Sequence, residues 1–257
     1  MSDWNPALYA RFSDERLRPV VDLLARVPLD APARIVDLGC GAGASTAPLR
    51  ARWPEADILG IDTSPAMLEK AATVVPTARF AQADVATWEP DTPVDLLFSN
   101  ATLHWVPDHA RLLPRLMGLL APGGVLAVQV PDNLDEPSHA LMHALAAEPP
   151  FAERLRDAAA TRAVLLSVEE TYDALTPFAD HVEIWRTTYV HALAGPDTIV
   201  EMVTSAGLKP FVDPLDGDLR AAFLERYRRG VAAAYPRTAS GQVLFRFPRL
   251  FFVAVRR

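Results

Sequence analysis

The first half of the chain alternates between short apolar runs and longer segments with apolar residues at helical spacing. Each run ends in polar or glycine-rich punctuation, a pattern typical of buried strands. The runs occupy residues 33–38, 57–61, 78–83, 94–99 and 125–130. The helix-like segments occupy residues 44–53, 65–75 and 108–120. Strands that alternate with helices predict an α/β fold with a parallel sheet covered on both faces.

The loops after the strands are where we expect chemistry. Ligands of parallel α/β sheets bind beyond the carboxyl ends of the strands. The loops that follow the first four apolar runs are therefore expected to face one cleft.

The second half of the chain has a different pattern, with helices gathered between two long strands. The helical segments are 136–147, 151–160, 169–175 and most of 197–235, and the strands are 182–192 and 243–255. We expect a single domain with a lid. In it, residues 1–30 form an N-terminal helical lid, residues 31–132 a ligand-binding core, and residues 133–257 a substrate cap with the late strands.

Composition narrows the class of protein. Half of the 257 residues are hydrophobic, and 32 acidic against 25 basic side chains give a net charge of −7. An acidic surface repels phosphate backbones, so nucleic acid is not expected as a partner. No apolar stretch reaches the roughly 18 residues of a membrane span, and no signal peptide precedes Phe12. One cysteine, Cys40, fits a reducing, cytoplasmic location.

A glycine-rich turn follows the first predicted strand. Glycine lets a backbone turn tightly and approach a ligand closely. Residues 36–43 (VDLGCGAG) place three glycines between a strand and a helix, a pattern that equally fits an ordinary turn. Asp62, 19 residues after Gly43, could accept ribose hydroxyls or simply cap a helix. Asp84 could accept an adenine amino group or form a turn.

Four motifs in order carry a family resemblance. They are DLGCGAG (37–43), IDTSPAML (61–68), QADV (82–85) and LAPGGVLAV (120–128). Over about residues 30–130, the chain resembles the class I S-adenosylmethionine-dependent methyltransferases. That resemblance implies a Rossmann-like fold with a mostly parallel seven-stranded sheet, helices on both faces and a helical cap or lid.

The resemblance also implies S-adenosylmethionine as cofactor, no metal, and a set of contacts. Those contacts are Gly39, Gly41 and Gly43 beside the methionine part, Asp62 and Met67 at the ribose, Asp84 and Val85 at adenine, and Asn100 on the sulfonium side. Cys40 lies inside the glycine loop, and without a neighbouring histidine in sequence it is expected to fill space, not to act as a nucleophile.

Further segments resemble one subfamily, the trans-aconitate 2-methyltransferases. They are residues 3–12, 16–19, 99–105, 130–133, 184–189 and 247–251. This resemblance implies methyl transfer to a carboxylate of trans-aconitate, giving a monomethyl ester. A carboxylate is already ionised at neutral pH and needs no general base. We therefore expect positioning and exclusion of water to drive the reaction, with no catalytic side chain.

A small tricarboxylate substrate calls for cationic recognition, which the planar fork of arginine suits. Arg186 is the preferred candidate, because it lies in an apolar and aromatic strand. Any one arginine can equally be an ordinary surface residue. The full candidate set is Arg16, Arg186, Arg246 and Arg249, with His104, His139 and Tyr189 as polar partners, Trp105 as a pocket wall, and Trp4, Tyr9 and Phe12 as lid aromatics.

Three other functions stay open. A malonyl-carrier-protein O-methyltransferase shares the SN-x-x-x-x-W loop, but should carry a basic docking patch for its acidic partner. Another small-molecule carboxyl methyltransferase is compatible with the same motifs. A regulatory protein that binds the cofactor without turnover is the alternative from another class. The GxGxG spacing argues against an NAD-dependent dehydrogenase. The oligomeric state cannot be derived from these patterns.

Overall fold

The computed structural model describes residues 13–158, 162–204 and 207–257, and their side chains from Leu17 onward. They form two compact units, which we describe separately. The sheet unit contains Arg16–Pro131, Ala163–Thr187 and Arg249–Arg257. The helical unit contains Asp132–Arg162 and Thr188–Pro248. The division of the chain into an N-terminal lid, a ligand-binding core and a substrate cap stays a prediction. Residues 1–12 of the proposed lid lie outside the described residues.

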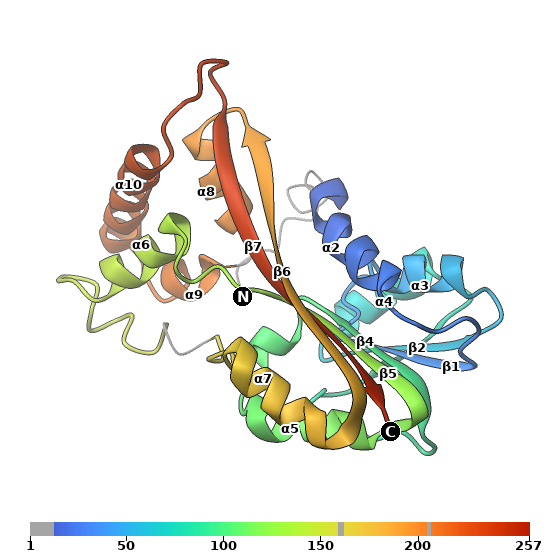
Figure 1. Ribbon diagram of the computed structural model, residues 1–257. Helices are drawn as coiled ribbons and strands as arrows, with labels where there is room; N and C mark the ends of the chain where they lie inside the picture. Colours follow the sequence, from blue (N-terminus) through green and yellow to red (C-terminus); the bar gives the residue numbers. More distant parts are fainter. Residues whose placement is uncertain (1–12, 159–161, 205–206) are drawn as a thin grey trace. The chain divides into compact units, whose positions relative to one another are not determined.

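The described residues form a seven-stranded sheet in the order β3-β2-β1-β4-β5-β7-β6 (Figure 1). The first five strands pair in parallel, and β7 runs antiparallel to β5. This is the predicted Rossmann-like α/β fold. The strands are β1 (Arg34–Leu38), β2 (Asp57–Asp62), β3 (Arg79–Gln82), β4 (Val94–Asn100), β5 (Leu120–Pro131), β6 (Ala179–Leu193) and β7 (Val243–Arg256).

Helices cover both faces of the sheet in the sheet unit (Figure 1). The inner strands are apolar on both sides, as parallel sheets require, and Leu97 and Phe98 are both fully buried. On one side lie α2 (Ser13–Ala25), α3 (Thr46–Arg52) and α4 (Pro65–Val74), and on the other α5 (His109–Gly118) and α7 (Val168–Leu175). Short 3-10 turns η1 (Leu103–Trp105) and η3 (Thr176–Phe178) complete this unit.

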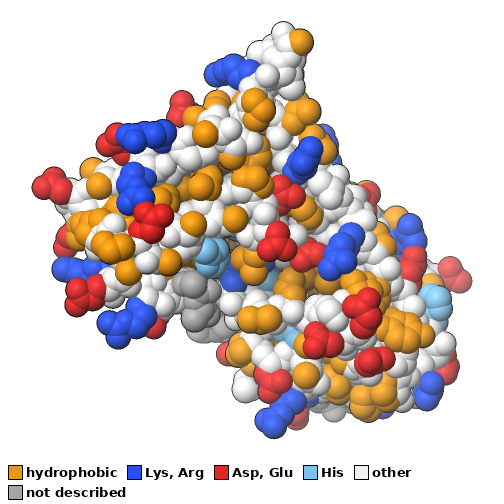
Figure 2. All heavy atoms as spheres, turned by 60° about the vertical axis from the view of Figure 1, so that its left-hand side comes forward, with side chains coloured by type: hydrophobic (Ala, Val, Ile, Leu, Met, Phe, Trp, Pro, Cys, Tyr) orange, Lys and Arg blue, Asp and Glu red, His pale blue; other side chains and the backbone are white. Residues whose placement is uncertain are grey.

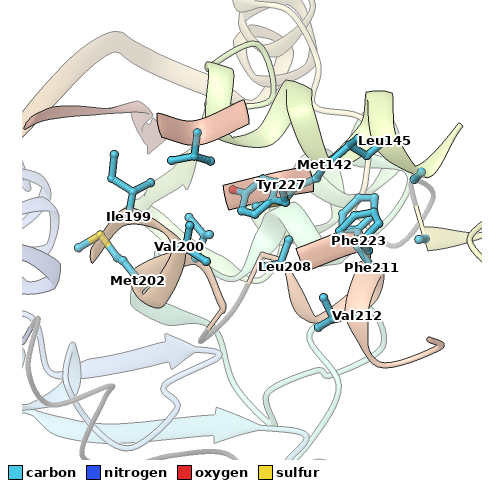
Figure 3. Packing of buried hydrophobic residues seen from close by; sticks show 14 of the residues in the cluster. Met142, Leu145, Ile199, Val200, Met202, Leu208, Phe211, Val212, Phe223 and Tyr227 are labelled. Carbon is cyan, nitrogen blue, oxygen red and sulfur yellow. The ribbon is translucent and has the colours of Figure 1, made fainter. Parts of the chain in front are cut away.

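The helical unit has a hydrophobic core of its own (Figure 3). Phe223 and Tyr227, one turn apart on the longest helix, are both fully buried in it. The Tyr227 hydroxyl donates to the Ser138 carbonyl at 2.9 Å, which links two helices of the unit. Its helices are α6 (Pro137–Ala146), α8 (Pro196–Thr204), α9 (Lys209–Val212) and α10 (Gly217–Ala234).

Two local predictions were wrong. Residues 151–157 form successive turns instead of the predicted helix over 151–160. This segment mixes two kinds of backbone hydrogen bond. Leu155 N–H donates to the Phe151 carbonyl four residues earlier, whereas Arg154 N–H donates to the same carbonyl three residues earlier, so no regular helix forms. β5 also begins at Leu120, five residues before the predicted strand over 125–130, and its register against β4 shifts between these points.

No helix in the described ranges is long and apolar enough to cross a membrane.

Substitutions at two neighbouring residues of β7 should differ strongly in their effect on stability. Phe245 is fully buried against the Tyr235 and Phe247 rings, whereas Leu244 is 47% exposed. We expect Phe245→Ala to lower the free energy of unfolding by about 3–5 kcal/mol, and the control Leu244→Ala to change it by less than about 1 kcal/mol. Urea denaturation measures both. Equal losses in the two variants would contradict the assignment of this strand's buried face.

Candidate functional site

The Asp62 carboxylate joins the loops that follow β1 and β2. The Gly41 amide donates to its Oδ2 at 3.0 Å, and the Ser64 amide donates to its Oδ1 at 2.9 Å. The amides of Gly39 and Cys40 both donate to the Ile61 carbonyl, at 2.8 and 2.9 Å. The parallel pairing of β1 with β2 brings these two loops together, as expected for carboxyl ends at one edge of a sheet.

The three motif glycines have positive φ angles of 72°, 53° and 87°, which other residues rarely adopt. A Cβ on Gly39 would lie 2.2 Å from the Thr102 side chain, and a Cβ on Gly43 would lie 3.3 Å from Ala71 Cα. A Cβ on Gly41 would meet no atom of the described residues within 4 Å. Within that part of the chain, Gly41 therefore faces open space, where a ligand could approach the backbone.

Asp37, in the middle of the first motif, is fully buried under the glycine loop. Its Oδ2 accepts hydrogen bonds from Ser45 Oγ at 2.7 Å and Thr46 Oγ1 at 2.6 Å. Burial raises the pKa of the Asp37 carboxyl to about 6, although the hydrogen bonds from Thr46 and Ser45 lower it in part. This carboxylate is engaged in fixing the start of α3 against β1.

The predicted adenine loop follows β3. Asp84 is exposed, and its Oδ1 accepts the Ala86 amide at 2.8 Å, which is the turn geometry that the sequence left open. Val85 is buried. Met67, at the predicted ribose position, is half-buried, and its amide donates to the Ser64 carbonyl at 3.1 Å.

The loop after β4 begins at Asn100, whose Oδ1 is buried and has no hydrogen-bond partner among the residues that the structure describes. Ala101 has a positive φ of 56°. Its amide donates to the Gln129 carbonyl at 2.9 Å, and Thr102 Oγ1 donates to the Gly39 carbonyl at 3.1 Å. The β4 loop is thus bonded to both the glycine loop and β5.

These residues fit the cofactor that the motifs imply. An ionised carboxylate offers about four lone-pair positions, and the two backbone amides on Asp62 leave room for both hydroxyls of a ribose. The open backbone at Gly41 and the buried acceptor on Asn100 suit a polar ligand in the same place. All eight predicted cofactor residues belong to the sheet unit.

The predicted substrate residues divide between the units. In the sheet unit, His104 is buried beside Trp105, which is 41% exposed, with ring centroids 4.6 Å apart. Arg186 is exposed on β6, and Arg249 is half-buried on β7. The helical unit holds His139, Tyr189 and Arg246. Trp4, Tyr9, Phe12 and the side chain of Arg16 lie outside the described residues.

His139 belongs to a buried polar network in the helical unit. Asn133 Nδ2 lies 3.2 Å from His139 Nε2, and Ser138 Oγ lies 3.1 Å from His139 Nδ1. Arg162 Nη1 donates to Asn133 Oδ1 at 2.9 Å. Burial lowers the pKa of the Arg162 guanidinium to about 10. Sequence reasoning missed Arg162, because it lies in an alanine-rich segment without motif or periodicity.

Cys40 is buried inside the glycine loop, and burial raises the pKa of its thiol above its ordinary value. A protonated thiol is a poor nucleophile, so this geometry supports a packing role. Among the described residues, no group of three or more His, Cys, Asp or Glu side chains could hold a metal ion.

The raised pKa of Asp37 predicts a pH dependence of stability. The folded state holds this proton more tightly than the unfolded state, so the free energy of unfolding falls as pH rises. The expected loss is about 3 kcal/mol between about pH 4 and pH 6. Asp37→Asn keeps an acceptor oxygen and should remove this component, as measured by urea denaturation at stepped pH.

The control for that measurement is Asp57→Asn, at the exposed start of β2. It should keep the wild-type slope between those pH values. An Asp37→Asn slope identical to wild type would exclude Asp37 as the source.

The chain matches a family model described as a methyltransferase domain over residues 9–173. It is 61% identical over 257 residues to the trans-aconitate 2-methyltransferase of Methylobacterium nodulans, covering 100% of this chain and 99% of that protein. It is 55% identical over 256 residues to the trans-aconitate 2-methyltransferase of Methylobacterium radiotolerans, covering 99% and 98%.

Solved structures of lower identity share the fold. The geranyl diphosphate C-methyltransferase of Streptomyces coelicolor, solved with S-adenosyl-L-homocysteine, matches with a TM-score of 0.55 at 16% identity, covering 97% of this chain and 82% of that one. The phosphoethanolamine N-methyltransferase 2 of Haemonchus contortus, solved with S-adenosyl-L-methionine, matches with a TM-score of 0.56 at 16% identity, covering 93% and 52%. The chain therefore belongs to the class I S-adenosylmethionine-dependent methyltransferases and, within them, to the trans-aconitate 2-methyltransferase family.

Proposed function

We propose that the chain transfers a methyl group from S-adenosylmethionine to a carboxylate of trans-aconitate, giving a monomethyl ester and S-adenosylhomocysteine. The observation that carries this proposal is the 61% identity to a trans-aconitate 2-methyltransferase across the whole chain. Such similarity includes the late strands and the helical unit, where the cofactor motifs no longer constrain the sequence. A small tricarboxylate, and neither nucleic acid nor membrane, is the proposed partner.

The cofactor supplies an electrophilic methyl group on a positively charged sulfur. In the proposal, Asp62 holds its ribose with Met67 nearby, Asp84 and Val85 contact adenine, and the three motif glycines with Asn100 lie along the methionine part. The open backbone at Gly41 and the free capacity of the Asp62 carboxylate support these roles.

The acceptor carboxylate is a nucleophile without help from a base. The buried carboxyl nearest the glycine loop, Asp37, already accepts hydrogen bonds from Ser45 and Thr46. Neither this group nor the Cys40 thiol is needed for proton transfer. Orientation of the two reactants and exclusion of water are therefore the proposed sources of rate.

Arginines are proposed to recognise the remaining carboxylates. Arg186 and Arg249 of the sheet unit are the candidates within the same unit as the cofactor residues. Arg16 and Arg246 are the other two. His104, His139 and Tyr189 would add polar contacts, with Trp105 as a wall and Trp4, Tyr9 and Phe12 as aromatics of a lid.

A carrier-protein substrate is the main alternative. A basic docking patch would support it, but Figure 2 shows acidic and basic side chains interspersed on the face that it draws. With a net charge of −7, the chain favours a small substrate over an acidic protein. A cytoplasmic location is part of the proposal, in keeping with the single cysteine.

A labelled-methyl assay tests the proposed function. The purified protein is offered trans-aconitate, cis-aconitate, citrate, isocitrate or a malonyl carrier protein, each with labelled S-adenosylmethionine. Base-labile label is expected on trans-aconitate. Label on the carrier protein would assign the alternative function. Cofactor binding without any labelled product would indicate a regulatory protein that binds the cofactor without turnover.

The two aspartates of β2 predict a difference in cofactor binding. Asp62→Ala should weaken S-adenosylmethionine binding by about 1–3 kcal/mol, because it removes charge-assisted hydrogen bonds to the ribose and to the glycine loop. The control Asp57→Ala, at the other end of β2, removes only an exposed ion pair with Arg79 and should bind normally. Calorimetry measures both, and wild-type affinity in Asp62→Ala would remove Asp62 from the site.

A further inference from the structure

β5 carries a buried amide in an otherwise apolar strand. Gln129 is 0% exposed, and the four residues before it, 125–128, are apolar and equally buried. Its Nε2 has no hydrogen-bond partner in the part of the chain that the structure describes. Buried polar atoms in folded proteins are almost always satisfied, so an unused buried donor points to a partner outside the described residues, such as a bound ligand.

The strand register places Gln129 beside two candidate site residues. Asn100 of β4 pairs with Gln129 of β5, and Arg249 of β7 pairs with Pro131, two residues further along β5. Directly paired residues share a face of the sheet, as do residues two apart in one strand. Asn100, Gln129 and Arg249 therefore lie on one face at the carboxyl ends of β4 and β5, all within the sheet unit.

Arg249 contacts the other end of the Gln129 amide. Its Nη1 lies 3.5 Å from Gln129 Oε1. With the amide oxygen facing the guanidinium, Nε2 points its hydrogens elsewhere. Gln129 and Arg249 then present an amide N–H donor beside guanidinium N–H donors. Together these donors match the acceptor oxygens and the negative charge of a carboxylate.

The surroundings strengthen such an interaction. Phe251, which pairs with Gln129 in the β5–β7 ladder, is fully buried and stacks on Trp185 with centroids 4.9 Å apart and an interplanar angle of 10°. Hydrogen bonds to a charged group are stronger beside apolar walls than in water. The Ala101 amide, which donates to the Gln129 carbonyl, also fixes this part of β5 to the β4 loop.

We propose that Gln129 and Arg249 together bind a non-reacting carboxylate of the acceptor substrate. Donors and a positive charge withdraw electron density from the carboxylate that they bind, so this carboxylate is held, and a different one attacks the methyl group. Gln129 is thus a specificity-determining residue for a polycarboxylate acceptor. The inference rests on the proposed function and names a binding contact within that site.

Gln129→Met tests this role because it removes the amide and keeps the side-chain length. The KM for trans-aconitate should rise about tenfold or more, with kcat changed far less, since the contact exists in both the ground and transition states. The Kd for S-adenosylmethionine should stay at its wild-type value. Gln129→Glu should raise KM further, because a carboxylate repels the bound carboxylate and competes for Arg249.

Thermal unfolding separates this role from a structural one. The buried Nε2 without a partner costs free energy, and the 3.5 Å contact between Gln129 Oε1 and Arg249 is too long to offset that cost, so Gln129→Met should have an equal or higher Tm than the wild type. The control Gln242→Met, at an exposed glutamine, should change neither KM nor Tm. A lower Tm for Gln129→Met together with an unchanged KM would overturn the proposal in favour of a structural role.

A comparison of substrates identifies the interaction itself. Glutaconate, mesaconate and itaconate each lack a different one of the three carboxylates of trans-aconitate. For the dicarboxylate that lacks the anchored carboxylate, Gln129→Met should no longer raise KM, because the contact is already missing. The same increase for all four substrates would overturn the proposal. If the wild-type protein makes no ester from trans-aconitate, the proposed function is wrong, and the proposed binding of a carboxylate by Gln129 and Arg249 is wrong with it. If the wild type makes the ester but Gln129→Met leaves KM unchanged, only the proposed carboxylate contact is wrong.

Discussion

The candidate site depends on one carboxylate that is shared by two loops. Asp62 ends β2, yet one of its oxygens holds the Gly41 amide of the loop after β1. Without this bond the glycine loop would rely on two amide bonds to the Ile61 carbonyl, on the Thr102 hydroxyl bonded to the Gly39 carbonyl, and on its own internal turn. The residue proposed to recognise the ribose is therefore also the residue that shapes the backbone beside the methionine part. Cofactor recognition and loop geometry are coupled through this single side chain.

Several buried polar side chains lie near the carboxyl ends of the strands, and they differ in which of their polar atoms have hydrogen-bond partners. Asp37 accepts two hydroxyls through Oδ2 and fixes α3, while its buried Oδ1 has no partner among the described residues. Asn100 and Gln129 each keep an unused buried polar atom within the described part of the chain. A core designed only for stability would replace such groups with apolar ones. Their position at the carboxyl ends of the strands suggests that stability is given up there for binding.

Much of the architecture follows from sequence periodicity and from the motifs. The five parallel strands were predicted within a few residues, because each is a short apolar run followed by a residue that interrupts the apolar pattern: Gly39, Asp62, Asp84, Asn100 or Pro131. The helix predicted over 151–160 was wrong because an apolar and charged pattern does not distinguish a helix from a series of turns. Gln129 was missed as a candidate for another reason. A single polar residue at the end of an apolar run looks like the end of a strand, and only burial and register reveal it.

The network around His139 shows why side-chain chemistry in the helical unit could not be derived from sequence. Asn133 uses its oxygen to accept from Arg162, so its nitrogen is the atom that faces His139 Nε2. An amide nitrogen only donates, hence Nε2 must accept and the ring proton resides on Nδ1, next to Ser138 Oγ. A histidine that alone looks switchable is thus held in one tautomer by an arginine 23 positions away in sequence.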